Sequence, residues 1–172
     1  SKVQQLRGDA AAAEVPAAAT QHLRHPAVFE RKRFSEAANR RISLLDAGGF
    51  YDRSQVFSAT LVELDPENST LLNNRAYVLA EKGVLLDAAA EMAERALQLH
   101  KEEPAFIRDT LGWVYAEAQR NDEALAIFER LIDEDRKQAF YQYHYGVVLN
   151  QLDRKTDAMK AFERALDSKT IS

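Results

Sequence analysis

Residues 105–138 read AFIRDTLGWVYAEAQRNDEALAIFERLIDEDRKQ, and parts of this stretch return 34 positions later. The recurring positions are Gly112 as Gly146, Ala124 as Ala158, Phe128 as Phe162, and Glu129-Arg130 as Glu163-Arg164. A fixed interval of about 20 to 50 residues is typical of a solenoid, in which each unit buries its apolar face against its neighbours. The interval therefore predicts a stack of repeated units that displays a surface.

The quoted stretch predicts two helices. At helical spacing the first half places on one face Arg108, Leu111, Gly112 and Tyr115, and on the opposite face Asp109, Thr110, Trp113 and Ala116. The second half carries an apolar stripe of Ala124, Ile127, Phe128 and Leu131, with Asp122 as the expected N-cap. Glycine disfavours a helix interior by about 1 kcal/mol. We therefore expect Gly112 to allow close helix packing beside Phe128.

These residues resemble the tetratricopeptide repeat family. The resemblance rests on residues 109–115, 122–125 and 127–130, and on Tyr145-Gly146, Leu149, Asp157-Ala158, Ala161-Phe162 and Ala165-Leu166 in the next unit. It implies an all-α fold, a right-handed α-solenoid of antiparallel helix pairs. It also implies a non-catalytic scaffold for protein–protein interaction. Bacterial members often serve envelope assembly, polysaccharide export, pilus or secretion systems.

Four units are expected over residues 35–172. Units 105–138 and 139–172 are regular, whereas unit 69–104 is two residues longer, with one insertion expected in the turn at 83–86 and one before Pro104. Unit 35–68 is degenerate: Gly48-Gly49 break its first helix, and Ser54 stands where the family has a small residue. Residues 1–34 are expected to form a helical cap, and a flexible Ala-rich leader is the alternative.

Composition agrees with long helices and few turns, since the chain holds 6 Gly and 4 Pro among 172 residues. The absence of cysteine excludes a disulfide framework, a thiol nucleophile and a thiolate zinc site. No apolar stretch approaches the roughly 18 residues of a membrane span. The compartment stays open between a bacterial periplasm or envelope and a cytoplasm.

Charge is unevenly distributed along the chain. Residues 21–55 contain seven basic and four acidic residues, whereas the residues after Gln55 contain 14 basic and 21 acidic. Two interpretations remain open: the asymmetry steers a charged partner to one end, or the charges are solvated helix faces. Nucleic-acid binding is not expected, because no basic patch is interleaved with stacking aromatic residues.

The resemblance places the first helix of each pair on the concave side of the solenoid. The residues expected to line it recur across the units as Asn39, Asn73, Asp109 and Tyr143, then Arg40, Asn74, Thr110 and His144, then Ser43, Tyr77, Trp113 and Val147. Amides suit the backbone of an extended peptide, and Tyr77 and Trp113 offer flat apolar area. We predict peptide binding along this row. The alternative for Tyr77 and Trp113 is packing against a neighbouring helix.

A subgroup of the family captures a C-terminal carboxylate with lysines and an arginine. The matching places here hold Asn73, Tyr77, Thr110, Phe140 and His144, so this clamp is expected to be absent. The groove instead suits an internal peptide segment or a partner helix. His144 on this face is a hypothesis for pH-sensitive binding.

No pair of acids, nucleophile with base, or phosphate-binding loop has a recognisable spacing, so the sequence does not predict an enzyme or a cofactor. His22 and His25 lie one helical turn apart, but no nearby acid completes a metal site. Self-assembly is the alternative function. The last unit has no evident capping helix, and Ala161, Phe162 and Leu166 are expected to be partly uncovered and to stack on another copy.

Overall fold

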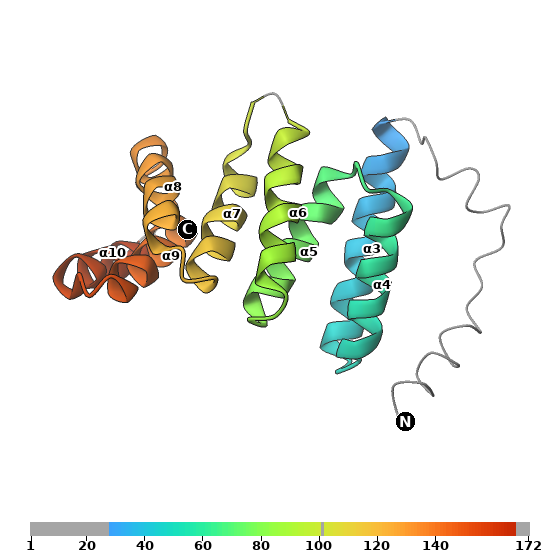
Figure 1. Cartoon of the computed structure of the whole chain (residues 1–172), viewed down its shortest axis with the longest axis horizontal. Coiled ribbons are helices and arrows are strands. Elements are labelled where there is room, and N and C mark those ends of the chain that lie inside the picture. The colour runs from blue at the N-terminus through green and yellow to red at the C-terminus, as the bar shows by residue number, and fades with distance from the viewer. Residues whose placement is uncertain (1–27, 101, 168–172) are drawn as a thin grey trace, which may run out of the picture. The chain divides into compact units, whose positions relative to one another are not determined.

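The computed structural model describes residues 28–100 and 102–167. Every regular element in these ranges is a helix, and consecutive helices pair into hairpins (Figure 1). Their bounds are α3 Val28–Ala47, α4 Tyr51–Leu64, α5 Ser69–Glu81, α6 Leu86–Gln98, α7 Ala105–Glu117, α8 Asn121–Glu134, α9 Ala139–Gln151 and α10 Lys155–Asp167. The predicted all-α fold of helix pairs is confirmed. The part of the predicted cap or leader up to Ala27 lies outside the described residues, as do His22 and His25.

The chain divides into two compact units, residues 1–66 and residues 67–172. The described part of the first unit is the pair α3 and α4. The second unit contains the three pairs α5–α6, α7–α8 and α9–α10.

In the first unit, α3 continues across the boundary set at Ser35 for the first repeat. It begins at Val28, shortly after Pro26, which suits the first turn of a helix running into Phe34 and the repeat, and it ends at Ala47 as the Gly48-Gly49 pair predicts. Gly49 has φ +77°, and the Phe50 amide donates to the Leu45 carbonyl at 2.8 Å, which closes the helix end. In α4, Ser54 is fully buried, so the degenerate unit still presents a small side chain at this position.

The turns inside the second unit repeat as the sequence does. Gln119 and Asp153, 34 residues apart, both have φ +59°, and each is followed by an amide that donates to a carbonyl of the preceding helix at 2.8 Å. The turn between α5 and α6 has four residues where the next pair has three, and Gly83 takes the left-handed conformation there with φ +62°. The insertion predicted in this turn is therefore present.

The second insertion is distributed differently from the prediction. The connection from α6 to α7 has six residues where that from α8 to α9 has four, and α6 is one residue shorter than α8. Helix α8 also begins two residues early, because Arg120 is its N-cap and Asp122 lies in the first turn. The predicted N-cap at Asp122 is therefore wrong. A carboxylate in the first turn still interacts favourably with the positive end of the helix dipole.

The two recurring glycines lie against phenylalanine rings. A Cβ atom built on Gly112 would lie 2.8 Å from Cζ of Phe128, and one built on Gly146 would lie 2.6 Å from Cε1 of Phe162. Any larger side chain would therefore overlap the ring. The predicted close packing beside Gly112 is confirmed, and it recurs in the next pair.

Helix α7 is buried on nearly all sides, although the sequence predicts one core face and one open face. Every residue from Leu111 to Ala116 is buried, and the helix packs on α5, α6, α8 and α9. The helix is central in its unit, so neighbours cover both of its faces. This burial changes which residues of the predicted concave row a ligand can reach.

Candidate functional site

The first helices of the three pairs form one layer in the second unit. Helix α7 packs on both α5 and α9, whereas the second helices α6, α8 and α10 pack mainly on first helices (Figure 1). Successive first helices therefore approach each other more closely than successive second helices do. This is the arrangement expected if the first helices line the inner side of the stack.

A buried polar cluster of Asp109, Trp113 and His144 connects α7 to α9 within this layer. His144 Nδ1 lies 2.8 Å from Asp109 Oδ1, and because a carboxylate only accepts, the imidazole donates this hydrogen bond. The Trp113 and His144 rings stack with centroids 4.6 Å apart and planes inclined by 23°. His144 is 3 % exposed and Trp113 is 8 % exposed. These two rings therefore hold the helices together, as the alternative interpretation of Trp113 proposes.

Other members of the predicted row differ in their access to solvent. Tyr143 is 49 % exposed and leans over the cluster, with its ring 5.6 Å from that of His144. Asn74 and Tyr77 on α5 are half-buried. Thr110 is buried, and its hydroxyl donates to the Phe106 carbonyl one turn earlier at 3.2 Å. The open surface of the row is therefore carried by Asn74, Tyr77 and Tyr143.

Two buried polar atoms of the row have no hydrogen-bond partner among the described residues. Asn73 donates from Nδ2 to Asn74 Oδ1 at 3.2 Å, while its own Oδ1 is unpaired. Trp113 Nε1 is unpaired as well. An unsatisfied buried polar group costs free energy. Both atoms lie beneath the surface of this face, in the contacts of α5 and α7.

Three residues near the row were missed by the sequence reasoning: Phe106, Glu81 and Glu117. Phe106 is 53 % exposed, and Phe140, which occupies the same place one unit later, is 62 % exposed. Their 34-residue recurrence and their spacing of three residues from Asp109 and Tyr143 were available as a signal. The two rings extend the open aromatic surface by one helical turn.

Acidic side chains follow the row at its other end. Glu81 lies four residues after Tyr77, and Glu117 lies four residues after Trp113. Burial and the Glu81 carboxylate raise the pKa of the Tyr77 hydroxyl. Burial, followed by the charge of Glu81, raises the pKa of the Glu117 carboxyl. The two carboxylates are therefore close enough to repel each other, which gives this end of the face a negative potential.

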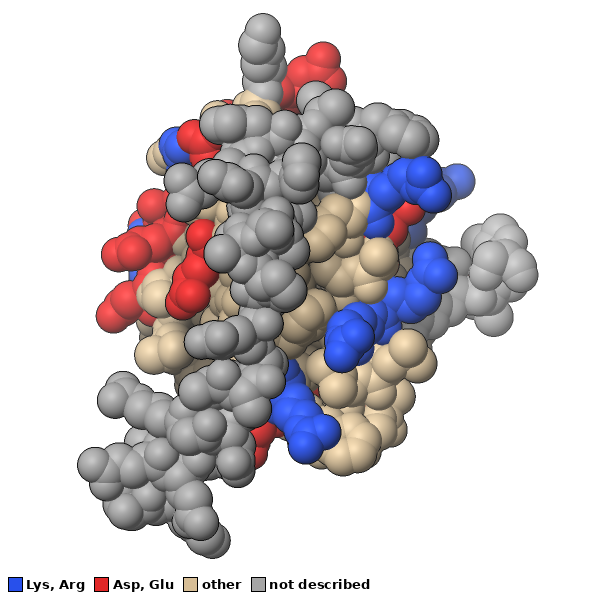
Figure 2. All heavy atoms as spheres, turned by 90° about the vertical axis from the view of Figure 1, so that its right-hand side faces the viewer, with Lys and Arg blue, Asp and Glu red and all other residues tan. Residues whose placement is uncertain are grey.

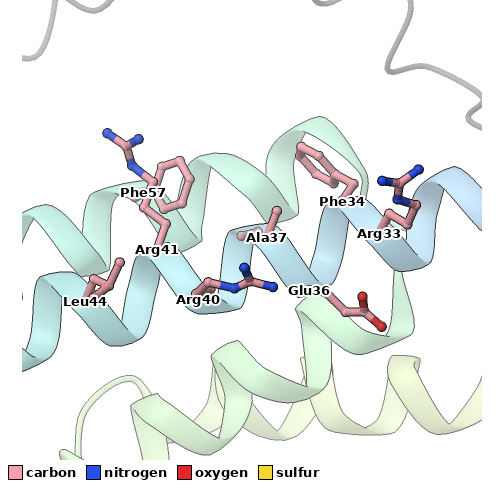
Figure 3. A pocket seen from close by; sticks show the side chains of 9 residues that line it. Arg33, Phe34, Glu36, Ala37, Arg40, Arg41, Leu44 and Phe57 are labelled. Carbon is pink, nitrogen blue, oxygen red and sulfur yellow. The ribbon is translucent and has the colours of Figure 1, made fainter.

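The remaining members of the predicted row, Asn39 and Arg40, lie on α3 in the first compact unit. Asn39 is half-buried and Arg40 is exposed. Arg40 lines a groove of about 680 Å³ with further residues of α3 and Phe57 of α4 (Figure 3). Seen from the side of α3 and α4, basic side chains gather along one stretch of the surface with uncharged residues between them (Figure 2).

A second groove of about 380 Å³ lies on the pair α9–α10. Its lining is uncharged and consists of Ala139, Phe140, Tyr143, Phe162, Ala165 and Leu166. Leu166 is 69 % exposed and Phe162 is half-buried, as expected from the sequence, whereas Ala161 is fully buried. The expectation that Ala161 is uncovered is therefore wrong, because Ala161 lies in the contact between α10 and α9.

The described ranges 28–100 and 102–167 contain no group of three His, Asp or Glu side chains placed to hold a metal ion. Among the helices described, none is long and apolar enough to cross a bilayer.

Comparisons with known proteins agree with this geometry. A tetratricopeptide repeat family model matches residues 110–170. Residues 41 to the end of MamA from Desulfovibrio magneticus RS-1 superpose with a TM-score of 0.63 at 17 % identity, covering 97 % of this chain and 93 % of that one. MamA MSR-1 superposes with a TM-score of 0.60 at 15 % identity, covering 79 % and 77 %. A further crystal structure of MamA gives 0.58 at 19 %, covering 75 % and 74 %.

At these identities the superpositions establish the fold alone, a stack of helix pairs over most of the chain. No curated protein sequence matches the chain. The expected resemblance to tetratricopeptide repeats is confirmed over the last two units by the family match.

Proposed function

Because residues 110–170 are tetratricopeptide repeats, we propose that this protein is a non-catalytic scaffold that binds a peptide segment or a partner helix. The binding face is the layer of α5, α7 and α9. The residues proposed to form it are Asn73, Asn74, Tyr77, Asp109, Thr110, Trp113, Tyr143 and His144, whereas Asn39 and Arg40 of the predicted row lie on α3 in the first unit. The setting that the resemblance favours is a bacterial envelope assembly, export or secretion system.

The observation that carries this proposal is a row of open aromatic rings over a fixed buried layer. Phe106, Phe140 and Tyr143 are each about half exposed or more. Below them the bonded pair Asp109 and His144 ties α7 to α9. Rings held on rigid helices lose little entropy on binding, and tyrosine and tryptophan are enriched where binding energy concentrates.

Because Trp113, Thr110 and His144 are buried, their role in binding differs from that of the exposed Tyr143. They support the face from below, whereas Tyr143, Tyr77 and Asn74 touch the ligand directly. Trp113 is also the single tryptophan of the chain. Its fluorescence therefore reports on ligand binding at this face.

The proposal is tested with peptides selected against the full chain from a display library of random segments of about 16 residues. We expect selected peptides to shift the Trp113 emission. Replacing Phe106 and Tyr143 together by Ala should weaken binding by about tenfold or more, since buried aromatic anchors typically carry most of the binding energy. Tyr51→Ala is the matched control, because Tyr51 is an equally exposed aromatic residue on α4.

Equal affinity in Phe106→Ala/Tyr143→Ala and in Tyr51→Ala would contradict the proposal, provided that circular dichroism shows folded variants. The same conclusion follows if the peptides bind without changing the Trp113 emission.

Self-assembly is the second candidate function, and one observation favours it. The groove on α9–α10 is apolar, and Leu166 in its lining is 69 % exposed. Contiguous exposed apolar surface of this kind marks interaction sites in soluble proteins. A second copy of the chain is the proposed occupant, and the test is described below.

A further inference from the structure

The groove on the first compact unit combines apolar and cationic side chains. Along α3 it is lined by Arg33, Phe34, Glu36, Ala37, Ala38, Arg40, Arg41 and Leu44, and from α4 by Phe57 (Figure 3). The lining therefore includes three guanidinium groups and one carboxylate, an excess of two positive charges. This groove lies within the first unit, whereas the peptide-binding face proposed above lies within the other.

The apolar residues lie between the arginines. Phe34 and Phe57 are half-buried, and Leu44 is 68 % exposed. Arg40 and Arg41 are exposed, and the Arg41 guanidinium stands 5.4 Å from the centre of the Phe57 ring. An apolar floor with charged residues around it is the usual anatomy of a protein–protein interface.

The length of the groove indicates the size of its occupant. Arg33 and Leu44 are eleven residues apart on α3, which corresponds to about 16 Å of helix. A partner helix of about three turns covers this distance and presents one apolar stripe with flanking charges. We expect carboxylates on those flanks, because the guanidinium groups of the arginines pair with carboxylates in bidentate geometry.

We propose that the α3–α4 groove docks an acidic amphipathic helix of a partner protein, with its apolar stripe on Phe34, Leu44 and Phe57 and its carboxylates against Arg33, Arg40 and Arg41. The chain's own N-terminal segment does not have this chemistry, since residues 1–27 contain three Lys or Arg and two Asp or Glu. Charge complementarity therefore points to a partner outside this segment.

Two other classes of anionic partner, a lipid bilayer and a single-stranded nucleic acid, fit the groove less well than an acidic helix. A bilayer is flat and does not enter a concave surface between two helices. Single-stranded nucleic acid binds through open aromatic faces on which successive bases stack, whereas Phe34 and Phe57 are half-buried and Arg41 lies over one face of Phe57. Both classes are kept as arms of the test.

The probe is a fluorescein-labelled helical peptide of about 15 residues, with Leu or Phe at every third or fourth position and Glu on the flanks. Binding to the full chain is followed by fluorescence anisotropy. Two comparison peptides carry Lys in place of Glu, or the same residues in scrambled order. We expect only the acidic amphipathic peptide to bind, and we expect its affinity to fall several-fold between 50 and roughly 300 mM salt.

The protein variants are Arg41→Glu and Arg53→Glu. Each arginine is exposed and stacks on a phenylalanine ring, Arg41 on Phe57 and Arg53 on Phe50, but only Arg41 lines the groove. We expect Arg41→Glu to lower the affinity by about tenfold or more and Arg53→Glu to change it less than about twofold. Arg40→Glu, a second groove variant, should act like Arg41→Glu.

The proposal is overturned if the scrambled peptide binds as well, or if Arg41→Glu and Arg53→Glu weaken binding equally. It is also overturned if the acidic peptide fails to bind while phosphatidylserine–phosphatidylcholine vesicles or a single-stranded oligonucleotide bind in an Arg41-dependent way. The double variant Phe106→Ala/Tyr143→Ala should bind this peptide normally. A loss in that variant would mean that the peptide occupies the face of α5, α7 and α9 instead.

Discussion

Two glycines at equivalent places in the last two units contact phenylalanine rings that differ in their freedom to move. Phe128, against Gly112, is fully buried, whereas Phe162, against Gly146, is half-buried. The added Cβ atom is close to a ring in both cases. The consequence for stability therefore depends on whether the ring can shift.

We predict that Gly112→Ala destabilises the protein and that Gly146→Ala is nearly neutral. Overpacking in a closed core costs about 1–3 kcal/mol, and alanine returns about 1 kcal/mol of helix propensity. Phe162 moves aside at the edge of the stack, so there the two effects nearly cancel. The measurement is the urea midpoint of each variant, and a larger loss in Gly146→Ala would contradict this account.

The hydroxyl of Tyr115 makes the stability of the folded state depend on pH in the alkaline range. It donates to Glu94 Oε1 at 2.8 Å and joins α7 to α6. Burial, followed by this hydrogen bond, raises the pKa of Tyr115 from 10.0 to about 12. The folded state thus keeps a proton that the unfolded state loses above its own pKa.

The stabilisation by this proton is fully present below about pH 10 and is lost as the pH rises towards about 12. We predict that the wild type loses stability relative to Tyr115→Phe across this window, because phenylalanine has no proton to lose. Urea unfolding of both proteins between pH 8 and roughly 11.5 measures the difference. A difference that does not change with pH would be inconsistent with the raised pKa.

At the scale of elements, Arg108 connects three segments. Its Nε donates to the Glu103 carbonyl at 3.0 Å in the α6–α7 connection, and both terminal nitrogens donate to the two oxygens of Glu134 at the end of α8. The hydrogen bonds with Glu134 raise the pKa of Arg108, and Arg108 lowers the pKa of Glu134. The guanidinium fork fixes the longer connection where Glu103 has φ +41°.

Arg108→Lys is predicted to lower the urea midpoint, because one ammonium group cannot replace three directed donors. We expect a loss of about 1 kcal/mol or more for this mostly buried residue. Arg154→Lys is the control, since Arg154 pairs with Asp157 on the surface and exposed pairs contribute little. Equal shifts of the urea midpoint in the two variants would show that the hydrogen bonds of Arg108 contribute no more to stability than an exposed ion pair does.

At the scale of the whole molecule, the apolar groove on α9–α10 bears on the oligomeric state. We predict that the protein associates as its concentration rises and that Leu166→Glu weakens this association, since a charge in an apolar interface is costly to desolvate. Sedimentation velocity over a concentration series is the measurement. Val56→Glu is the control, because Val56 is 58 % exposed and lies on α4 in the other unit. A monomer at every concentration would exclude self-assembly.

The second unit was predictable to within a residue or two because each of its contacts is nearly local. The recurrence of Gly112 and Phe128 as Gly146 and Phe162 specifies how the two helices of a pair approach, and the structure shows that contact twice. The N-cap at Arg120 was missed, since arginine has no strong capping preference.

The candidate site was only partly predictable. Periodicity placed Asp109, Trp113 and His144 on one row, and the resemblance assigned this row to the ligand. The structure shows instead that Trp113 and His144 stack between α7 and α9, while Phe106, which the sequence reasoning passed over, is open to solvent. Helical spacing reports which side a residue faces, but not whether the next pair covers that side.

The sequence by itself determined the helix pairs, their length and the small-residue contacts, because these depend on positions within about 34 residues of one another. Only the tertiary structure decided which side chains of the shared row are buried and which are exposed, and that the arginines of α3 line a groove with Phe57 of α4. The reason is physical. Exposure depends on how much of each helix its neighbours cover, and no local pattern encodes that area.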